Sequence, residues 1–116
     1  MFNWLKKISN SKKVKQKISI LEDGFEINNG NNTDQIKWAE IEKIIAFKKE
    51  LVTEDQICLE FESNNRTFYC SEDYEGWIEF EEMLRQQITQ IDETWKSSVS
   101  YPPFEESKTT IFLKSN

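Results

Sequence analysis

Apolar and polar residues alternate along most of the chain up to residue 72, a pattern typical of half-buried β-strands. We predict six strands there and a seventh later in the chain, over residues 14–21, 25–28, 36–38, 42–49, 56–62, 67–72 and 110–113. A sharp corner is predicted at Trp38–Ile41, between the third and fourth strands. Ile44 and Ile45 are both apolar, so part of the fourth strand is expected to be buried on both faces.

The spacing of apolar residues changes to a helical one after residue 72. The stripe, with intervals of 3, 4, 4 and 3 residues, consists of Trp77, Phe80, Leu84, Ile88 and Ile91. It predicts an amphipathic helix over about 73–91, packed on the sheet and capped by Ser71 or Asp73. Gly76 then lies in the first turn, at a cost of about 1 kcal/mol against Ala, which a close approach of helix and sheet would explain.

Together these elements predict an α+β domain over residues 14–114, preceded by a basic arm over 1–13. The fold is expected to be a bent antiparallel sheet or open barrel of six or seven strands with one long amphipathic helix. Its predicted core contains Ile20, Phe25, Ile27, Ile36, Trp38, Ile44, Leu59, Phe61, Phe68, Trp77, Phe80, Leu84 and Ile88.

A two-residue turn at Asn64–Asn65 sets the register of the fifth and sixth strands, since Asn readily takes positive φ. The predicted pairs are Ser63 with Arg66, Phe61 with Phe68, Leu59 with Cys70, and Cys58 with Ser71. Cys58 and Cys70 therefore fall on opposite faces and cannot form a disulfide. Two reduced thiols are expected of a cytoplasmic protein.

The charge of the 116 residues is unevenly placed. Residues 1–17 hold six Lys and no acid, and the rest has 15 − 6 = 9 basic against 21 acidic residues, a net charge of −12. Such a body would repel nucleic acid and attract a basic protein. No apolar run approaches the roughly 20 residues of a membrane-spanning helix.

The residue types for common chemistry are missing from the sequence. It has no His, three scattered Gly and two Cys, so we expect no catalysis, no metal and no cofactor. The acids Glu72, Asp73 and Glu75 are interpreted as complementing the helix dipole, rather than as a cation or acid–base site.

Three surfaces could instead bind a partner. The sheet face opposite the helix should present Cys58, Glu60, Glu62 and Tyr69, an acidic patch with an aromatic residue at its centre. The later segment with Trp95, Tyr101 and Phe104 is the competing site, unless these aromatics pack on the domain itself. In the N-terminal arm, Phe2, Trp4, Lys6 and Lys7 could rest on an anionic membrane surface, or the arm could be a solvated terminus.

An ordered series of motifs resembles that of a group of small, uncharacterised bacterial proteins. These motifs are Gly24–Phe25-x-Ile27, Ile36-x-Trp38-x-x-Ile41-x-x-Ile44, Ala46–Phe47–Lys48, Asp55-x-Ile57-x-Leu59-x-Phe61, Gly76–Trp77, Trp95, Pro103–Phe104 and Ile111-x-Leu113. Their corner also looks like that of pleckstrin-homology-like and GRAM-like domains. This resemblance implies a strongly bent sheet or open barrel closed by a helix. The first hairpin carries Glu22 and Asp23, whereas phosphoinositide-binding members of that class are basic there.

These observations favour a non-catalytic protein-binding module of a bacterial cytoplasm. One version is an immunity protein, whose acidic body steers it onto a basic toxin. The alternative is a membrane-surface adaptor that uses the Lys-rich arm, and a small-ligand-binding protein or enzyme is a distant third.

Overall fold

The computed structural model describes residues 15–50, 55–100 and 107–114. Its first three strands, β1 (Lys17–Ile20), β2 (Gly24–Asn28) and β3 (Thr33–Lys37), form an antiparallel sheet in the order β1-β2-β3. A short 3₁₀ helix, η1 (Trp38–Glu40), leads from β3 into the second sheet. That sheet has the order β6-β5-β4-β7 and consists of β4 (Ile41–Glu50), β5 (Asp55–Ser63), β6 (Arg66–Ser71) and β7 (Ser107–Leu113).

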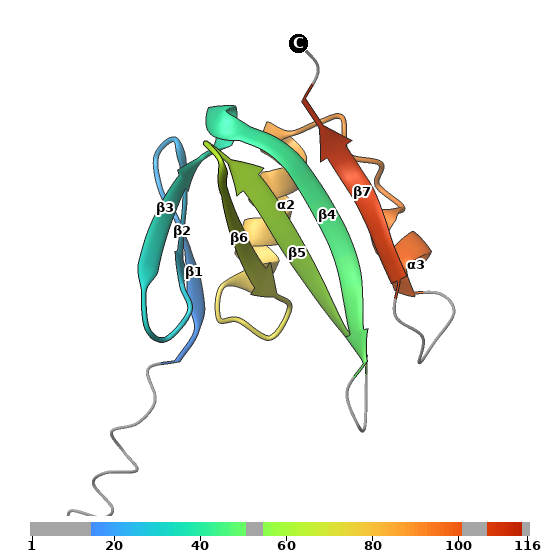
Figure 1. Cartoon of the computed structure of the whole chain (residues 1–116), viewed down its shortest axis with the longest axis horizontal. Helices are drawn as coiled ribbons and strands as arrows, with labels where there is room; N and C mark the ends of the chain where they lie inside the picture. The colour runs from blue at the N-terminus through green and yellow to red at the C-terminus, as the bar shows by residue number, and fades with distance from the viewer. Residues whose placement is uncertain (1–14, 51–54, 101–106, 115–116) are drawn as a thin grey trace, which may run out of the picture.

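Two helices lie on one face of the four-stranded sheet. α2 (Trp77–Gln87) runs behind β5 and β6 in Figure 1, and α3 (Trp95–Ser100) contacts β4, β5 and β7. The opposite face, turned toward the viewer, has no described helix over it. The prediction of an α+β fold with antiparallel strands is therefore confirmed.

The predicted single bent sheet is instead two sheets that separate at the Trp38–Ile41 corner (Figure 1). The Trp38 amide donates to the Asp23 carbonyl at 3.1 Å, which holds the start of η1 on the first hairpin. Ile41 already pairs with Ser63 of the second sheet. The three residues of η1 thus turn the chain from the first hairpin, where Trp38 is bound, to the second sheet, where Ile41 is paired.

The main helix begins later than predicted, because the turn before it is hydrogen-bonded to the β1 segment, and it ends at Gln87 rather than near Ile91. The Ile18 amide donates to the Glu75 carbonyl at 2.8 Å, and the Glu75 amide to the Gln16 carbonyl at 3.0 Å. Gly76 then enters the helix in the left-handed region, with φ 89°. A Cβ there would lie 2.2 Å from the Ile18 carbonyl oxygen, so the close approach expected at Gly76 exists and is made to β1.

Both sheets and both helices share one hydrophobic core. Phe25 of β2, Phe61 of β5 and Phe80 of α2 meet at its centre, with ring centroids 4.9–5.9 Å apart. The predicted core residues are buried except two: Trp38 is half-buried, and Ile20 is 37% exposed. Ile20 pairs with Phe25 and so shares the face of the core, but it is the last residue of β1 and lies at the rim.

Candidate functional site

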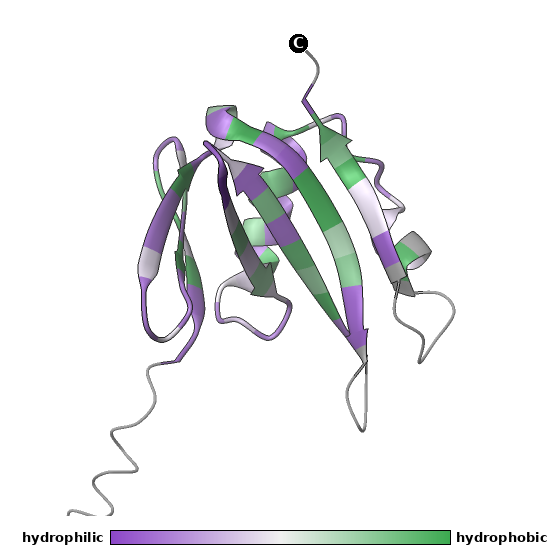
Figure 2. Cartoon of the chain, viewed as in Figure 1, coloured by the Kyte–Doolittle hydropathy of each residue, from purple (hydrophilic) through white to green (hydrophobic). Residues whose placement is uncertain are grey.

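The face of the four-stranded sheet opposite α2 is the first candidate site. The hairpin register predicted from the Asn64–Asn65 turn is confirmed at all four pairs. Paired residues lie on the same side of a sheet, so each row of partners across the strands can be assigned to a face. In Figure 2, hydrophobic positions form a continuous stretch along the middle of β4, and hydrophilic positions interrupt the hydrophobic ones toward the end of β5.

The central row of this face contains most of the predicted site. Glu60 pairs with Tyr69 of β6 and with Ile45 of β4. Tyr69 is 51% exposed, and the side chains of Glu60 and Ile45 are half-buried. Glu62 follows in the next row, where it pairs with Lys43. The structure thus brings Glu60, Glu62 and Tyr69 together on one face.

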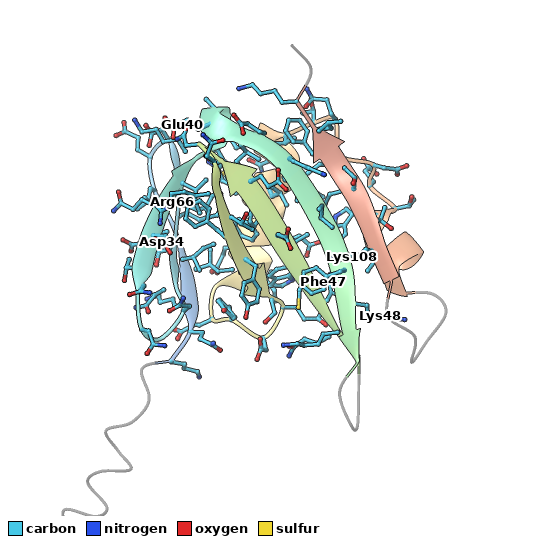
Figure 3. The ribbon with its side chains drawn as sticks, in the orientation of Figure 1. Asp34, Glu40, Phe47, Lys48, Arg66 and Lys108 are labelled. Carbon is cyan, nitrogen blue, oxygen red and sulfur yellow. The ribbon has the colours of Figure 1, made fainter. Side chains whose placement is uncertain are left out.

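The neighbouring strands make this face less acidic than predicted. Lys43 stands opposite Glu62, and Lys108 of β7 pairs with Phe47 of β4. The Lys108 ammonium nitrogen lies 5.7 Å from the centroid of the half-buried Phe47 ring, within cation–π range (Figure 3). The face therefore has an acidic half over β5, beside Tyr69 of β6, and a basic half over β4 and β7. We call it the two-charge face, defined by Lys43, Ile45, Phe47, Glu60, Glu62, Tyr69 and Lys108.

Cys58 lies on this side of the sheet, but the prediction that it is presented outward is wrong. It is 1% exposed. Burial is the main cause that raises the pKa of its thiol from 9.0 to about 11; the positive charge of Lys49 opposes the shift, and Asp73 and Glu72 add to it. The thiol is protonated at neutral pH and is a poor nucleophile. Cys70 is also free and buried.

The acids before α2 do not cap the helix as predicted. The Glu72 carboxylate accepts a hydrogen bond from the Ile57 amide at 2.9 Å, and Asp73 accepts one from the Ser71 hydroxyl. The cap residue, Gly76, has no side-chain hydrogen bond. These acids therefore fasten the turn between β6 and α2 to β5 and β6. Over residues 15–50, 55–100 and 107–114, no group of three or more potential ligands could hold a metal ion.

The remaining candidate residues are one core residue and several that lie outside the described residues. Trp95 is 3% exposed and belongs to the hydrophobic core, which favours the packing alternative over the partner-binding one. Tyr101, Phe104 and the N-terminal residues Phe2, Trp4, Lys6 and Lys7 lie outside the described residues. Within the described part of the chain, neither helix has the length and apolar character needed to cross a bilayer.

The basic half of the two-charge face was not predicted from the sequence. Continuing the hairpin register one strand further would have placed Phe47 and Ile45 beside Cys58 and Glu60. The pairing of β7 with β4 could not be inferred in the same way, because no short turn joins those strands. Comparison with family models, curated proteins and solved structures finds no match to this chain.

Proposed function

We propose that this chain is a non-catalytic protein-binding module that recognises a basic partner through the two-charge face. The observation that carries the proposal is Tyr69, a large aromatic residue left 51% exposed beside Glu60 on a sheet face that no described helix covers. Tyr is enriched among residues that anchor interfaces, and carboxylates around it favour a partner with Lys or Arg.

The charge of residues 18–116 supports the same class of partner. The net charge of −12 after residue 17 would speed association with a cationic protein and would weaken as salt is added. An immunity protein that neutralises a basic toxin is the particular version we favour. A pleckstrin-homology-like arrangement of the strands belongs to this proposal as well, since such folds often serve as binding modules.

The test compares two variants that change equal numbers of charges and apolar groups. Tyr69→Ala with Glu60→Lys alters the two-charge face, and Ile78→Ala with Glu82→Lys alters exposed positions of α2. Each tagged protein is incubated with native bacterial lysate at low and at high salt, and captured proteins are quantified by mass spectrometry. We expect a basic protein to be captured by the wild type and the α2 variant at low salt, and at least tenfold less by the Tyr69 variant. Equal capture by all three would contradict the proposal.

The second candidate, a membrane-surface adaptor, is favoured by the six lysines and the aromatic residues of 1–17. Each Lys near an anionic surface contributes about 1 kcal/mol. Co-sedimentation with phosphatidylserine vesicles, with and without residues 1–13, separates this function from the first. Binding that depends on residues 1–13 and not on Tyr69 would favour the adaptor.

A further inference from the structure

The charges of the two-charge face are not neutralised within the chain. Glu60 and Glu62 of β5 and Lys43 of β4 are half-buried, and none of the three is in an ion pair with a residue that the structure describes. Lys108 of β7 is exposed and approaches the Phe47 ring rather than a carboxylate. All four charged groups can therefore pair with charges that a second molecule supplies.

Large hydrophobic side chains are exposed on both outer strands of the same face. Tyr69 of β6 is 51% exposed, and Leu113 of β7 is 68% exposed. Leu113 pairs with Lys43 and therefore lies on the same side of the sheet as Lys43. Ile45 and Phe47 are half-buried between these strands. Hydrophobic groups interspersed with charges, on a face that no described helix covers, are typical of a surface that binds another protein (Figure 1).

The order of the charges across the strands makes this face complementary to itself. In the sheet order β6-β5-β4-β7, the acids lie on β5 and the lysines on β4 and β7, on opposite sides of the line between β5 and β4. A twofold axis along this line would place β5 of one copy over β4 of a second copy, and β6 over β7. Glu62 and Lys43 are paired in one row, so Glu62 of each copy would face Lys43 of the other. A twofold axis across the strands would instead bring acid against acid.

We propose that two copies of this chain pack their two-charge faces together, with the twofold axis along the strands between β4 and β5. Tyr69 then lies over β7 of the second copy, between Lys108 and Leu113, and Ile45 and Phe47 lie near the axis. Two sheets with nearly aligned strands pack well in this way. The copies repel each other through their equal net charge, so we expect a weak dimer, with a Kd on the order of 0.1 mM.

The dimer does not depend on the protein-binding function proposed above. A basic partner would have to displace the second copy, because both would occupy the two-charge face. Self-association would then lower the apparent affinity for that partner as the concentration of this chain rises.

The test exchanges charges in the full chain and measures association by analytical ultracentrifugation, up to about 1 mM protein, roughly ten times the expected Kd. The basic variant, Glu60→Lys with Glu62→Lys, has only lysines among the four charged positions, and the acidic variant, Lys43→Glu with Lys108→Glu, has only acids. The wild type should dimerise, and each variant alone should associate at least tenfold more weakly because like charges meet. An equimolar mixture of the two variants should dimerise again, since each charge then meets its opposite.

A matched control separates complementary faces from attraction by net charge. Glu79→Lys with Glu82→Lys, at exposed positions of α2, gives a net charge of −6 + 4 = −2, equal to that of the basic variant. This control should dimerise within threefold of the wild type. It should bind the acidic variant, of net charge −6 − 4 = −10, at least tenfold more weakly than the basic variant does. Equal binding of the acidic variant by both would overturn the proposal.

Concentration-dependent ¹⁵N NMR spectra of the wild type locate the interface. Signals of the Ile45, Glu60 and Tyr69 amides should shift between dilute and concentrated samples, whereas those of Ile78 and Glu82 on α2 should not. A wild type that stays monomeric at about 1 mM would overturn the dimer, as would shifts confined to α2. A mixture that fails to associate, although both variants keep well-dispersed spectra, would overturn it as well. None of these results changes the capture of a basic protein tested above, so the two proposals fail separately.

Discussion

Two buried residues, Cys58 and Tyr74, hold weakly acidic groups inside the domain. Burial raises the pKa of Cys58 from 9.0 to about 11 and that of Tyr74 from 10.0 to about 12, and it raises the pKa of Cys70 as well. The folded state therefore favours their protonated forms more strongly than the unfolded state does. Their contribution to stability is complete below the unfolded pKa values and is lost as the pH rises through the folded ones.

This linkage predicts a loss of stability at alkaline pH. The urea midpoint should be level near neutral pH and should fall from about pH 9 toward pH 12, where the folded groups at last ionise. Cys58→Ser removes one titrating group with little change in size, so its stability should fall less steeply between pH 9 and pH 11. Ile78→Ala removes no titrating group and should keep the wild-type slope. If the urea midpoint of Cys58→Ser fell with pH as steeply as that of the wild type, ionisation of the buried thiol would not contribute to the loss of stability.

In helix α2, the face on which a residue lies decides how much a substitution changes the free energy of unfolding. Phe80 is fully buried, with its ring 4.9 Å from that of Phe25 and 5.9 Å from those of Phe61 and Trp77. Phe80→Ala should lower the free energy of unfolding by about 3–5 kcal/mol, because it leaves a cavity among aromatic rings. Ile78 is 78% exposed, and Ile78→Ala should change the free energy of unfolding by less than about 0.5 kcal/mol. Urea denaturation measures the free energy of unfolding of both variants. Similar losses in Phe80→Ala and Ile78→Ala would mean that a different face of the helix packs on the sheet.

Elements whose geometry is set locally were predictable from the sequence. Asn64 and Asn65 take φ 51° and 63°, and this two-residue turn fixes the whole register of β5 and β6, including the pair of Glu60 with Tyr69. The start of α2 was not predictable, because the left-handed Gly76 is explained only by its approach to β1, far away in the sequence. The same holds for Cys58: period-2 alternation assigns its side chain to a face, but it does not show that the side chain is buried there, with 1% exposure.

Two polar contacts join the hairpin of β5 and β6 to the β3–η1 segment. An Arg66 guanidinium nitrogen lies 3.1 Å from an Asp34 carboxylate oxygen, between β6 and β3 (Figure 3). The Asn64 side-chain amide donates to the Glu40 carboxylate of η1, also at 3.1 Å. Both contacts belong to the hairpin of β5 and β6, and they hold it against the segment that leaves the first sheet.

The Arg66–Asp34 pair should make a small but measurable contribution. Single and double substitutions to Ala should give a coupling free energy of about 0.2–1 kcal/mol, reduced at high salt, since the Arg66 side chain is 65% exposed. The exposed pair Lys37–Asp23, separated by 4.0 Å on the first hairpin, is the matched control and should show no measurable coupling. Equal coupling in both pairs would mean that Arg66 and Asp34 do not join the sheets.

The place of β7 beside β4 has a consequence for the order in which the molecule assembles. Partners in this ladder are far apart in the chain, from 107 − 48 = 59 to 113 − 43 = 70 residues, whereas the strands of every other described pair are separated by at most four residues of chain. Closing so long a loop costs conformational entropy before any contact offsets it, and distant pairings of this kind slow folding. During synthesis, after all residues through α3 have left the ribosome, one edge of β4 would still lack its hydrogen-bonding partner β7. The seven residues of β7 therefore set the moment at which the sheet can be completed.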